Sequence, residues 1–341
     1  MLTRKQSIWG KISLVALGAL LILLPFAGCA PEAPEETLAY ADGGWDSIQV
    51  HSRIVAFVLE HGYGYQAEFI PGETITLLQG VLRGDLDIHM EVWIKSQQEA
   101  YDKAIATGNI VNLGTNFADT WQGWVVPTYM IKGDPARGIE PMAPDLKSVS
   151  DMPKYWELFK DPEVPTKGRF HSCIPGWECQ VWNEMKIESY GLDEYYNLFL
   201  PGSGPALAGS MAAAYEKGEP WFGYYWEPTW IMGKFDMTKV EEPPFDEEIW
   251  ETTKACAWPS DPTEIVVHVS LLDRAPEVVE FLKKYETTTA MNNEFLAYMQ
   301  ETEADTQAAA IWFLKEYESL WTQWVPSSVA KKVKAALETL P

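Results

Sequence analysis

Apolar, β-branched runs alternate with segments of helical period in the part of the chain that follows residue 36. Residues 37–40, 65–70 and 86–93 have the composition of buried strands, whereas residues 47–61 and 74–83 repeat apolar positions every three or four residues. The order strand, helix, strand, helix, strand is typical of an α/β unit with a mainly parallel sheet. A first α/β lobe is therefore expected here.

A second lobe is predicted to begin where this pattern breaks, near residue 126. Pro127 and the loop at 132–138 interrupt the alternation, and new strands are expected at 169–171 and 222–226. More than 300 residues follow the N-terminal segment, which is more than one hydrophobic core usually serves. Two lobes are the expectation.

The chain is then predicted to return to the first lobe through a strand at 264–270. Helices are expected at 276–285 and from 287 onward. Two crossings between lobes predict a hinge and a ligand cleft. The predicted division is 36–125 plus 262–341 for lobe I, and 126–261 for lobe II.

An apolar stripe near the C-terminus has helical spacing and a bulky, aromatic composition. One such stripe on a terminal helix is most often a core face, and we interpret it so rather than as a ligand or membrane surface. The stripe consists of Ile311, Leu314, Tyr317, Trp321 and Trp324.

The first 28 residues have the features of a signal peptide, because basic residues precede an apolar run that ends at Ala27-Gly28-Cys29. The run is shorter than the roughly 20 residues a membrane-spanning helix needs, which disfavours the alternative of a membrane anchor. Small residues before a cysteine also resemble the bacterial lipobox, which implies lipidation of Cys29. Ordinary secretion with Cys29 removed is the other alternative. Residues 29–35, rich in proline and glutamate, are expected to be a tether.

The net charge of −23 excludes some partners and leaves the ligand open. Residues 1–28 contain three basic groups and no acid, so the remaining chain carries −26. Nucleic acid is therefore not an expected partner. We expect a monomer without cofactor or metal, on the outside of the cytoplasmic membrane.

The cysteines allow one short disulfide. Cys173 and Cys179 bracket a five-residue loop, and a local bond between them would leave Cys256 as an odd thiol. A zinc site is the alternative, but it lacks a second pair of cysteines or histidines.

Sixteen tryptophans are several times the ordinary number, and many lie at turns or strand ends. Three loops are candidates for a cleft, at 91–93, 173–179 and 224–230. A quaternary ammonium has no N–H to donate, but its spread positive charge is attracted by the negative face of an indole. The backbone N–H groups that enter a helix after Gly176 are suited to a carboxylate at the other end of such a solute.

The motifs in these loops resemble those of the glycine betaine and proline betaine binding proteins of ABC importers. The chain contains a strand that ends in Trp93, then Cys173-Ile-Pro-Gly-Trp177-Glu-Cys179, then Tyr225-Trp226-Glu-Pro-Thr-Trp230 after a Gly-Glu-Pro turn. The resemblance extends from about residue 37 to the final helix. It implies a two-lobed α/β fold of the type II periplasmic-binding-protein kind that passes its solute to permease subunits, and not an enzyme.

The resemblance also implies roles for single residues. Trp93, Trp177 and Trp226 would form a cage around the ammonium group, and the backbone amides of Glu178 and Cys179 would bind a carboxylate. The bond between Cys173 and Cys179 would hold the loop in shape.

One residue departs from the family pattern. Gln97 stands where the compared proteins have a histidine that helps to hold the carboxylate, and it brings no positive charge. Choline, carnitine or another methylated amine therefore stays open beside the betaines. The side chains of Glu178 and Glu227 would attract a cation if they face the cage, and otherwise they point to solvent.

Other tryptophans have open roles at this stage. Trp45 is either a fourth wall of the cage or a neighbour of a helix-capping turn at Asp46 and Ser47. Trp258 either lines the cleft or packs in the hinge. Trp221 and Trp230 are expected to be outer or core partners.

Two other function classes also use tryptophan platforms. A lipid-anchored glycoside hydrolase would need an acid and a base across one cleft, for which Asp87 and Glu91 are the candidates. A carbohydrate-binding or adhesion module would need only stacked aromatic rings, but such modules usually have a β-sandwich. The alternation of strands and helices disfavours the second class.

Overall fold

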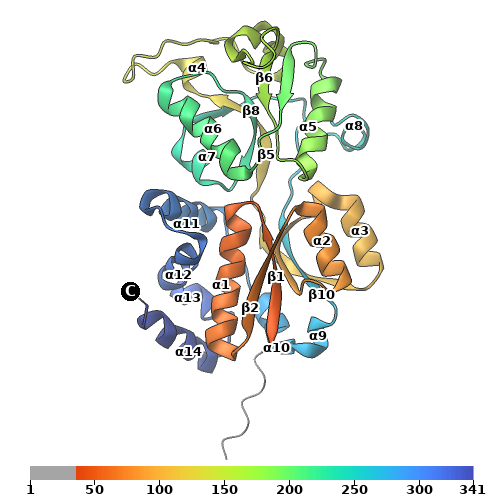
Figure 1. The fold of residues 1–341 in the computed structure, drawn as a ribbon, viewed down its shortest axis with the longest axis vertical. Coiled ribbons are helices and arrows are strands. Elements are labelled where there is room, and N and C mark those ends of the chain that lie inside the picture. Colours follow the sequence, from red (N-terminus) through yellow and green to blue (C-terminus); the bar gives the residue numbers. More distant parts are fainter. Residues whose placement is uncertain (1–35, 341) are drawn as a thin grey trace, which may run out of the picture. The chain divides into compact units, whose positions relative to one another are not determined.

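Two five-stranded sheets organise the chain (Figure 1). The computed structural model describes residues 36–340, so the expectations for the signal peptide, Cys29 and the tether lie outside the described residues. In the described part, no helix has the length and apolar character needed to cross a membrane.

The first sheet has the order β2-β1-β3-β10-β4. Strand β1 pairs in parallel with β2 and β3, while β10 runs antiparallel to both β3 and β4. The predicted mainly parallel sheet is confirmed, with β10 as its antiparallel member. The strands are β1 (Thr37–Gly43), β2 (Gln66–Gly72), β3 (Ile88–Trp93), β4 (Ile110–Phe117) and β10 (Thr263–His268).

The second sheet has the order β7-β6-β8-β5-β9. Strand β6 is parallel to β7 and β8, and β5 runs antiparallel to β8 and β9. Each sheet thus contains one antiparallel strand, and the chain enters that strand directly after leaving the other sheet. The strands are β5 (Trp121–Pro127), β6 (Gly168–His171), β7 (Tyr196–Phe199), β8 (Gly223–Glu227) and β9 (Met237–Lys239).

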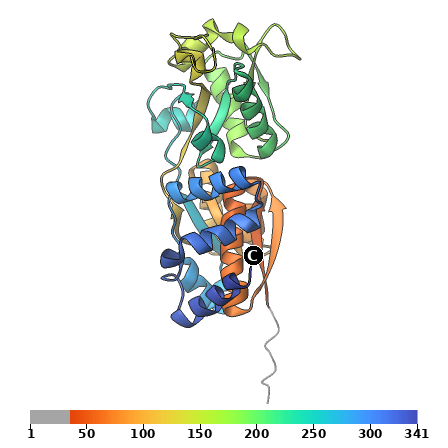
Figure 2. The ribbon, with the colours of Figure 1, turned by 90° about the vertical axis from the view of Figure 1, so that its left-hand side faces the viewer.

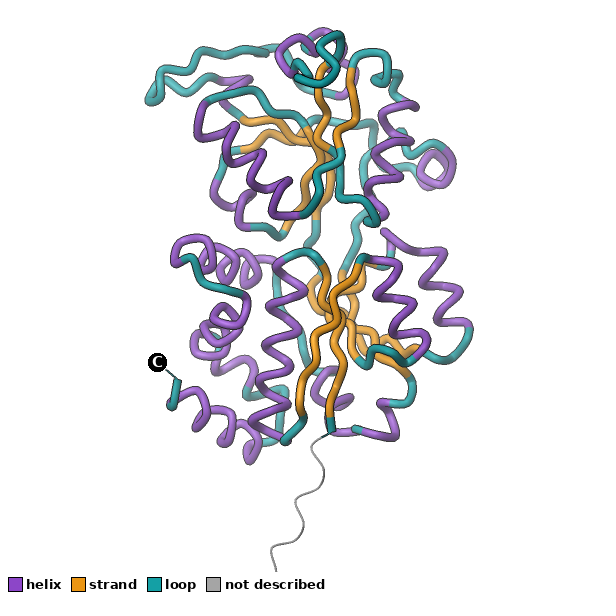
Figure 3. Tube along the Cα trace, viewed as in Figure 1, coloured by secondary structure: helices purple, strands orange, loops and turns teal. Residues whose placement is uncertain are grey.

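Helices cover both faces of the first sheet (Figures 1 and 3). Helices α1 and α11 to α14 lie on one side, and α2 and α3 lie on the other. The bounds are α1 (Asp46–Tyr63), α2 (Thr74–Arg83), α3 (Gln98–Ala106), α9 (Leu271–Arg274), α10 (Pro276–Leu282), α11 (Thr289–Thr302), α12 (Thr306–Glu316), α13 (Glu318–Trp321) and α14 (Ser327–Glu338), with a 3₁₀ turn η1 (Lys95–Gln97).

The second sheet is also flanked on two sides, by α5 on one side and by α6 and α7 on the other (Figure 1). The bounds here are α4 (Tyr129–Lys132), α5 (Glu178–Ser189), α6 (Gly204–Lys217), α7 (Trp230–Lys234) and α8 (Glu247–Thr252), with 3₁₀ turns η2 (Val149–Lys154) and η3 (Trp156–Phe159).

The chain passes between the sheets twice, through residues 118–120 and through residues 240–262. After the second passage β10 joins the first sheet, and the last helices pack against α1, as Figure 2 shows from the side. The residue-level division into lobes stays a prediction. Strand β5 lies wholly in the second sheet and begins five residues before the predicted boundary at 126.

The first helix shows why the elements begin and end where they do. Helix α1 buries Ile54, Val55 and Leu59 in the core that it shares with the sheet and the last helices. A fully buried side chain of this kind contributes about 1.5–3 kcal/mol. The helix ends at Tyr63 because Gly64 adopts a positive φ of 92°, from which its N–H reaches the carbonyl groups of the last turn.

The C-terminal stripe is core, as predicted, but it does not lie on one helix. It runs from α12 through α13 into the turn before α14. Trp321 is fully buried and its Nε1 donates to the carbonyl oxygen of Leu314 at 2.7 Å, which stabilises the break between α12 and α13. The spacing of the large residues did not predict this break, because the stripe residues on both sides of it still face the core.

Candidate functional site

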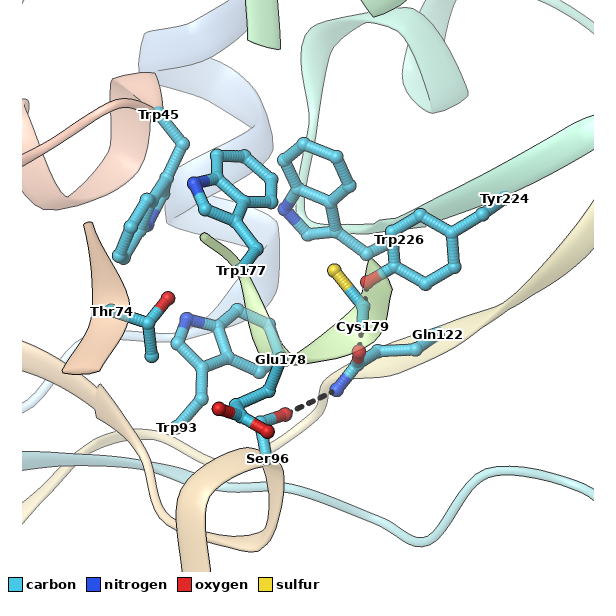
Figure 4. Close-up of a pocket in the computed structure, with 10 residues that line it drawn as sticks. All are labelled: Trp45, Thr74, Trp93, Ser96, Gln122, Trp177, Glu178, Cys179, Tyr224 and Trp226. Atoms are coloured by element: carbon cyan, nitrogen blue, oxygen red, sulfur yellow. Dashed lines mark hydrogen bonds between the residues drawn. The ribbon is translucent and has the colours of Figure 1, made fainter. Parts of the chain in front are cut away.

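Four tryptophan side chains from four separate segments line one cavity (Figure 4). Each residue is only 7% to 9% exposed. Trp45 lies between β1 and α1, Trp93 ends β3, Trp177 precedes α5, and Trp226 lies on β8. These four residues are called the tryptophan cluster below. They come from strand ends and helix starts, where α/β folds build their binding clefts.

Three rings of the cluster contact one another edge to face. The centroids of Trp45 and Trp177 are 5.4 Å apart with an interplanar angle of 79°, and those of Trp177 and Trp226 are 5.3 Å apart with an angle of 78°. Such T-shaped contacts are favourable for aromatic pairs and fix the orientation of each ring. Trp177 therefore stands between two rings that are held by different sheets.

Local sequence explains how Trp45 reaches the cavity. A Cβ atom on Gly43 would lie 2.5 Å from the Trp45 ring, so only glycine lets the indole fold back over the end of β1. Ser47 does not cap α1, because its Oγ donates to Glu91 at 2.9 Å and Trp45 occupies the N-cap position without a side-chain bond. The capping turn considered for this segment is therefore wrong, and Trp45 lines the cavity.

A disulfide closes the loop that carries Trp177. Cys173 and Cys179 are bonded, with their Cα atoms 5.7 Å apart, as predicted. Gly176 has a φ of 93°, a conformation that favours glycine, and the N–H of Trp177 bonds to the carbonyl oxygen of Ile174. The remaining cysteine of the described residues, Cys256, is buried and free.

The cavity is small. Its volume is about 50 Å³, and one water molecule needs ~10–15 Å³ of such space. The space fits a compact solute. Besides the tryptophan cluster, it is lined by Thr74, Ser96, Gln122, Glu178, Cys179 and Tyr224.

A chain of hydrogen bonds holds the polar side of the cavity (Figure 4). The Tyr224 hydroxyl donates to Gln122 Oε1 at 2.8 Å, and Gln122 Nε2 donates to Ser96 Oγ at 3.2 Å. Ser96 Oγ donates in turn to Asp261 at 2.6 Å, and Asp261 also accepts the backbone N–H groups of Lys95 and Ser96. Burial raises the pKa of Asp261 to about 6. The network joins η1 to the segment that precedes β10.

The lining contains a carboxyl group and no cationic side chain. Among the ten described residues that line the cavity, none is lysine, arginine or histidine, and Glu178 is the acid. Burial raises the pKa of Glu178, which is half-buried. The first N–H groups of any α-helix lack intrahelical acceptors, so the amides at the start of α5 are available for an acceptor on a ligand.

A second carboxyl group lies behind the cluster. Glu91 is fully buried, and its Oε1 accepts hydrogen bonds from Trp45 Nε1 at 2.7 Å and from Trp93 Nε1 at 3.0 Å. Burial raises the pKa of Glu91 to about 7, although three hydrogen bonds oppose the rise. One carboxyl group thus fixes two rings of the cluster.

A model of the substrate-binding domain of ABC-type glycine betaine transport systems matches residues 36–316. The chain belongs to this family. Members of the glycine betaine substrate-binding family are solute-binding proteins of importers, so the chain is a binding protein and not an enzyme.

Relatives and solved structures agree with the family. The trimethylamine N-oxide-binding protein of Pelagibacter ubique (strain HTCC1062) is 21% identical over 311 residues, which are 90% of this chain and 96% of the relative. A choline-binding protein of an ABC transporter in complex with choline has a TM-score of 0.71 at 16% identity, covering 88% of this chain and 98% of that one. Lactococcal OpuAC, complexed with glycine betaine in its closed-liganded conformation, has a TM-score of 0.68 at 17% identity, covering 86% and 100%. The two-lobed, type II periplasmic-binding-protein fold predicted for the chain is confirmed.

Most residues singled out by the family motifs lie together at the cavity, but Gln97 does not. Trp93, Trp177, Trp226, Glu178 and Cys179 all line it. The turn η1 directs Ser96 to the cavity instead, and Gln97 lines a neighbouring recess of about 600 Å³. The expected contact of Gln97 with the ligand is therefore not supported by its position.

Several other candidates lie outside the cavity. Glu227 pairs with Lys239 at 2.9 Å and does not line it. Trp258 packs on Tyr224, Trp182 and Trp250 and is not a lining residue. Trp221 stacks on His171, and Trp230 lies against Phe235.

The pair of carboxylates required by a glycosidase is also absent from the described cavity. Asp87 accepts from the N–H of Ala39 and from Arg274, while Glu91 bonds to the tryptophan cluster. Among residues 36–340, no group of three or more His, Cys, Asp or Glu side chains is arranged to hold a metal ion.

Sequence reasoning missed Ser96, Gln122 and Thr74 as lining residues, and it assigned Glu91 only to the rival enzyme. A signal for Glu91 exists in the sequence. It stands two residues before Trp93 on a buried strand, and side chains two apart on a strand share a face. An acidic residue on a strand that is buried along its whole length needs a partner, and here the indole N–H groups provide it.

Proposed function

We propose that the tryptophan cluster is a cage for the methylated ammonium group of glycine betaine or a related solute, which the protein delivers to an ABC permease. The observation that carries this proposal is the convergence of four indole rings on a small cavity whose lining has no cationic side chain. The ligands named for the relatives support it, because trimethylamine N-oxide, choline and glycine betaine share a trimethylated nitrogen.

The cage has enough faces for useful affinity. A cation over a desolvated aromatic ring gains about 1–2 kcal/mol. Three or four rings together supply several kcal/mol, before the shape of the cavity excludes bulkier groups. Because Glu91 holds the rings of Trp45 and Trp93 by hydrogen bonds within one sheet, these two rings lose little entropy on binding.

The rest of the ligand is proposed to meet the start of α5. The amides of Glu178 and Cys179 are suited to an acceptor oxygen, and the buried Nε1 of Trp177 has no partner within the described residues. Since Gln97 lies elsewhere and the Glu178 carboxyl repels anions, a ligand with a carboxylate gains less here than in a site with a histidine. Choline, carnitine and other methylated amines therefore stay candidates.

Binding is proposed to close the two lobes, with residues 36–125 plus 262–341 as one lobe and 126–261 as the other. The cavity supports this proposal because its walls come from both sheets. A ligand held between two lobes stabilises the closed state through contacts that the open state lacks.

The protein is proposed to work outside the cytoplasm on a lipid anchor at Cys29. Binding proteins of ABC importers are extracytoplasmic, and the support for the anchor itself comes from the sequence Ala27-Gly28-Cys29 after an apolar run. Membrane fractionation of the full-length precursor tests it. Cys29→Ala should move the protein from the membrane to the soluble fraction, and retention in the membrane would remove the anchor.

Calorimetric titration tests the binding function. The domain from residue 36 onward should bind at least one of glycine betaine, proline betaine, choline, carnitine and trimethylamine N-oxide, and Trp177→Ala should weaken that binding at least a hundredfold. Trp312→Ala is the matched control, because Trp312 of α12 stacks on Tyr298 of α11 and does not line the cavity. Absence of binding to all five solutes would contradict the proposal.

A further inference from the structure

Glu91 has an unusual set of partners. Its Oε1 accepts three hydrogen bonds, from the two indole N–H groups of Trp45 and Trp93 and from Ser47 Oγ. Its Oε2 is buried and has no partner within residues 36–340. None of the ion pairs among these residues involves Glu91, so the described protein contains a buried carboxyl group without a countercharge.

We propose that Glu91 is the countercharge and the positioning residue of the tryptophan cluster, so that binding of a cationic ligand drives Glu91 to the ionised form and releases a proton near neutral pH. The inference rests on the proposed function, because it requires a cation between the rings. It assigns to Glu91 a role in recognition without direct contact with the ligand.

The hydrogen bonds give the physical link between Glu91 and the ligand. An indole whose N–H donates to a carboxylate is polarised, and the negative charge on its face increases. Trp45 and Trp93 both donate to Glu91 in this way. Ionisation of Glu91 therefore strengthens the attraction of both rings for a cation in the cavity. The same two bonds fix the ring orientations before the ligand arrives.

Charge balance gives the second link. Taking a carboxylate out of water is costly unless a positive group is near, and burial accordingly raises the pKa of Glu91 to about 7. A quaternary ammonium carries a permanent charge and would bring it to the cavity directly in front of the rings. By reciprocity, the ligand stabilises the carboxylate to the same extent that the carboxylate stabilises the ligand.

Histidines and tyrosines around Glu91 do not titrate near neutral pH. Burial lowers the pKa of His89 and of His51 to about 3, so both stay neutral. Burial raises the pKa of Tyr285 and of Tyr40 far above neutrality.

Five of the acids on or beside the neighbouring strands and helices are relevant to a pH effect. Asp42 pairs with Arg53, and Glu264 accepts from Thr115 on the neighbouring strand. Burial raises the pKa of the other three, which makes them the competing sources of a pH effect: Asp46 on α1, Glu178 on α5 and Asp261 before β10.

The direction of the pH effect follows from linkage. Below pH 7 the ligand-free protein holds a proton on Glu91, and the ligand must displace it. Affinity therefore rises with pH through the ligand-free pKa. With a ligand-free pKa of about 7 and a carboxyl group that stays ionised in the complex at pH 6, affinity should be roughly tenfold tighter at pH 8 than at pH 6.

The experiment uses choline and tetramethylammonium, whose charge is constant over this range, at pH 6, 7 and 8. Wild type should show the tenfold rise. Glu91→Gln keeps an oxygen that accepts from the indole N–H groups but removes the charge. It should bind with one affinity at all three values, about tenfold weaker than wild type at pH 8. Asp46→Asn, Glu178→Gln and Asp261→Asn should each retain the pH slope, whatever their absolute affinity.

A measurement on the wild-type protein keeps the test independent of whether Glu91→Gln folds. Calorimetry at pH 7 in two buffers of different ionisation heat should report release of roughly half a proton per ligand bound. Binding that is independent of pH and releases no proton would overturn the inference while the proposed function stands. A slope that disappears in one of the three control variants would assign the proton to that residue instead. If neither probe nor any betaine binds, the proposed function fails, and the inference fails with it.

Discussion

Glu91 is a residue at which the requirements of stability and of ligand recognition oppose each other. It is fully buried, it accepts three hydrogen bonds, and it has no cationic partner among the described residues. An apolar replacement would remove the cost of burial but release two rings of the tryptophan cluster. A buried acid at position 91 in place of an apolar side chain is expected where the charge serves a function other than folding.

The stability of the ligand-free protein should reveal this cost. Because the folded pKa of Glu91, about 7, lies above the unfolded value of 4.5, the unfolded chain loses its proton first, and the free energy of unfolding falls as pH rises from 4.5 to 7. Between pH 5 and pH 8, wild type should lose up to about 3 kcal/mol relative to Glu91→Gln. Denaturant unfolding at several pH values measures the difference. Parallel curves for the two proteins would contradict the assignment.

The sequence predicted Trp93, Trp177 and Trp226 because their motifs are local. Their neighbours in the chain, Gly176 and the cysteines among them, determine where each ring points. Gln97 was misplaced for a related reason. Its direction depends on the 3₁₀ turn η1, which Asp261 holds from 164 residues away in the chain, and no local pattern reports such a partner.

At the scale of elements, α6 approaches the backbone at the end of β1 closely. A Cβ atom on Gly204, the first residue of α6, would lie 2.8 Å from the carbonyl oxygen of Gly44. Backbone atoms cannot yield as a flexible side chain does. This glycine lets an element of one sheet meet the backbone of the other beside Trp177.

Gly204→Ala should therefore hinder closure without harming the fold. We expect affinity for the ligand to fall at least tenfold, with the melting temperature unchanged or higher. Gly209→Ala on the same helix is the control, since its Cβ would meet nothing within 4 Å. It should leave affinity unchanged and add about 0.5–1 kcal/mol of stability. Equal affinities of the two variants in calorimetry would show that the contact does not matter for binding.

The alternation of strands and helices was readable from the sequence, and so was the return of the chain through β10. Its antiparallel direction was not, because hydrophobic periodicity is the same for either direction of a buried strand. The break between α12 and α13 also escaped prediction, since Trp321 satisfies its Nε1 locally and stays in the core.

At the scale of the whole molecule, the two passages between the sheets connect lobes that each carry part of the cavity wall. Asp261, in the second passage, accepts hydrogen bonds from Ser96 in η1 and from Thr120 in the first passage. These bonds hold the polar side of the cavity to the segments that connect the two sheets. The tryptophan cluster likewise takes two rings from each sheet.

Small-angle scattering should consequently show a smaller radius of gyration with ligand than without it. Trp177→Ala should remove the change at the same ligand concentration, because the ring that joins the two sheets is lost. Identical profiles with and without a tightly bound ligand would contradict closure as the mode of capture.

The central claim is that indole faces recognise a positive charge, and the most direct measurement compares each solute with its carbon isostere. Glycine betaine is matched by 3,3-dimethylbutanoate and choline by 3,3-dimethylbutan-1-ol, which have the same shape around a neutral carbon. Calorimetry should show the member with the quaternary nitrogen in the better-bound pair to be tighter by at least a hundredfold, equivalent to about 2.7 kcal/mol. Equal affinity for the nitrogen and carbon members of a pair would mean that the cluster recognises shape and apolar surface alone, and the cage account would be wrong.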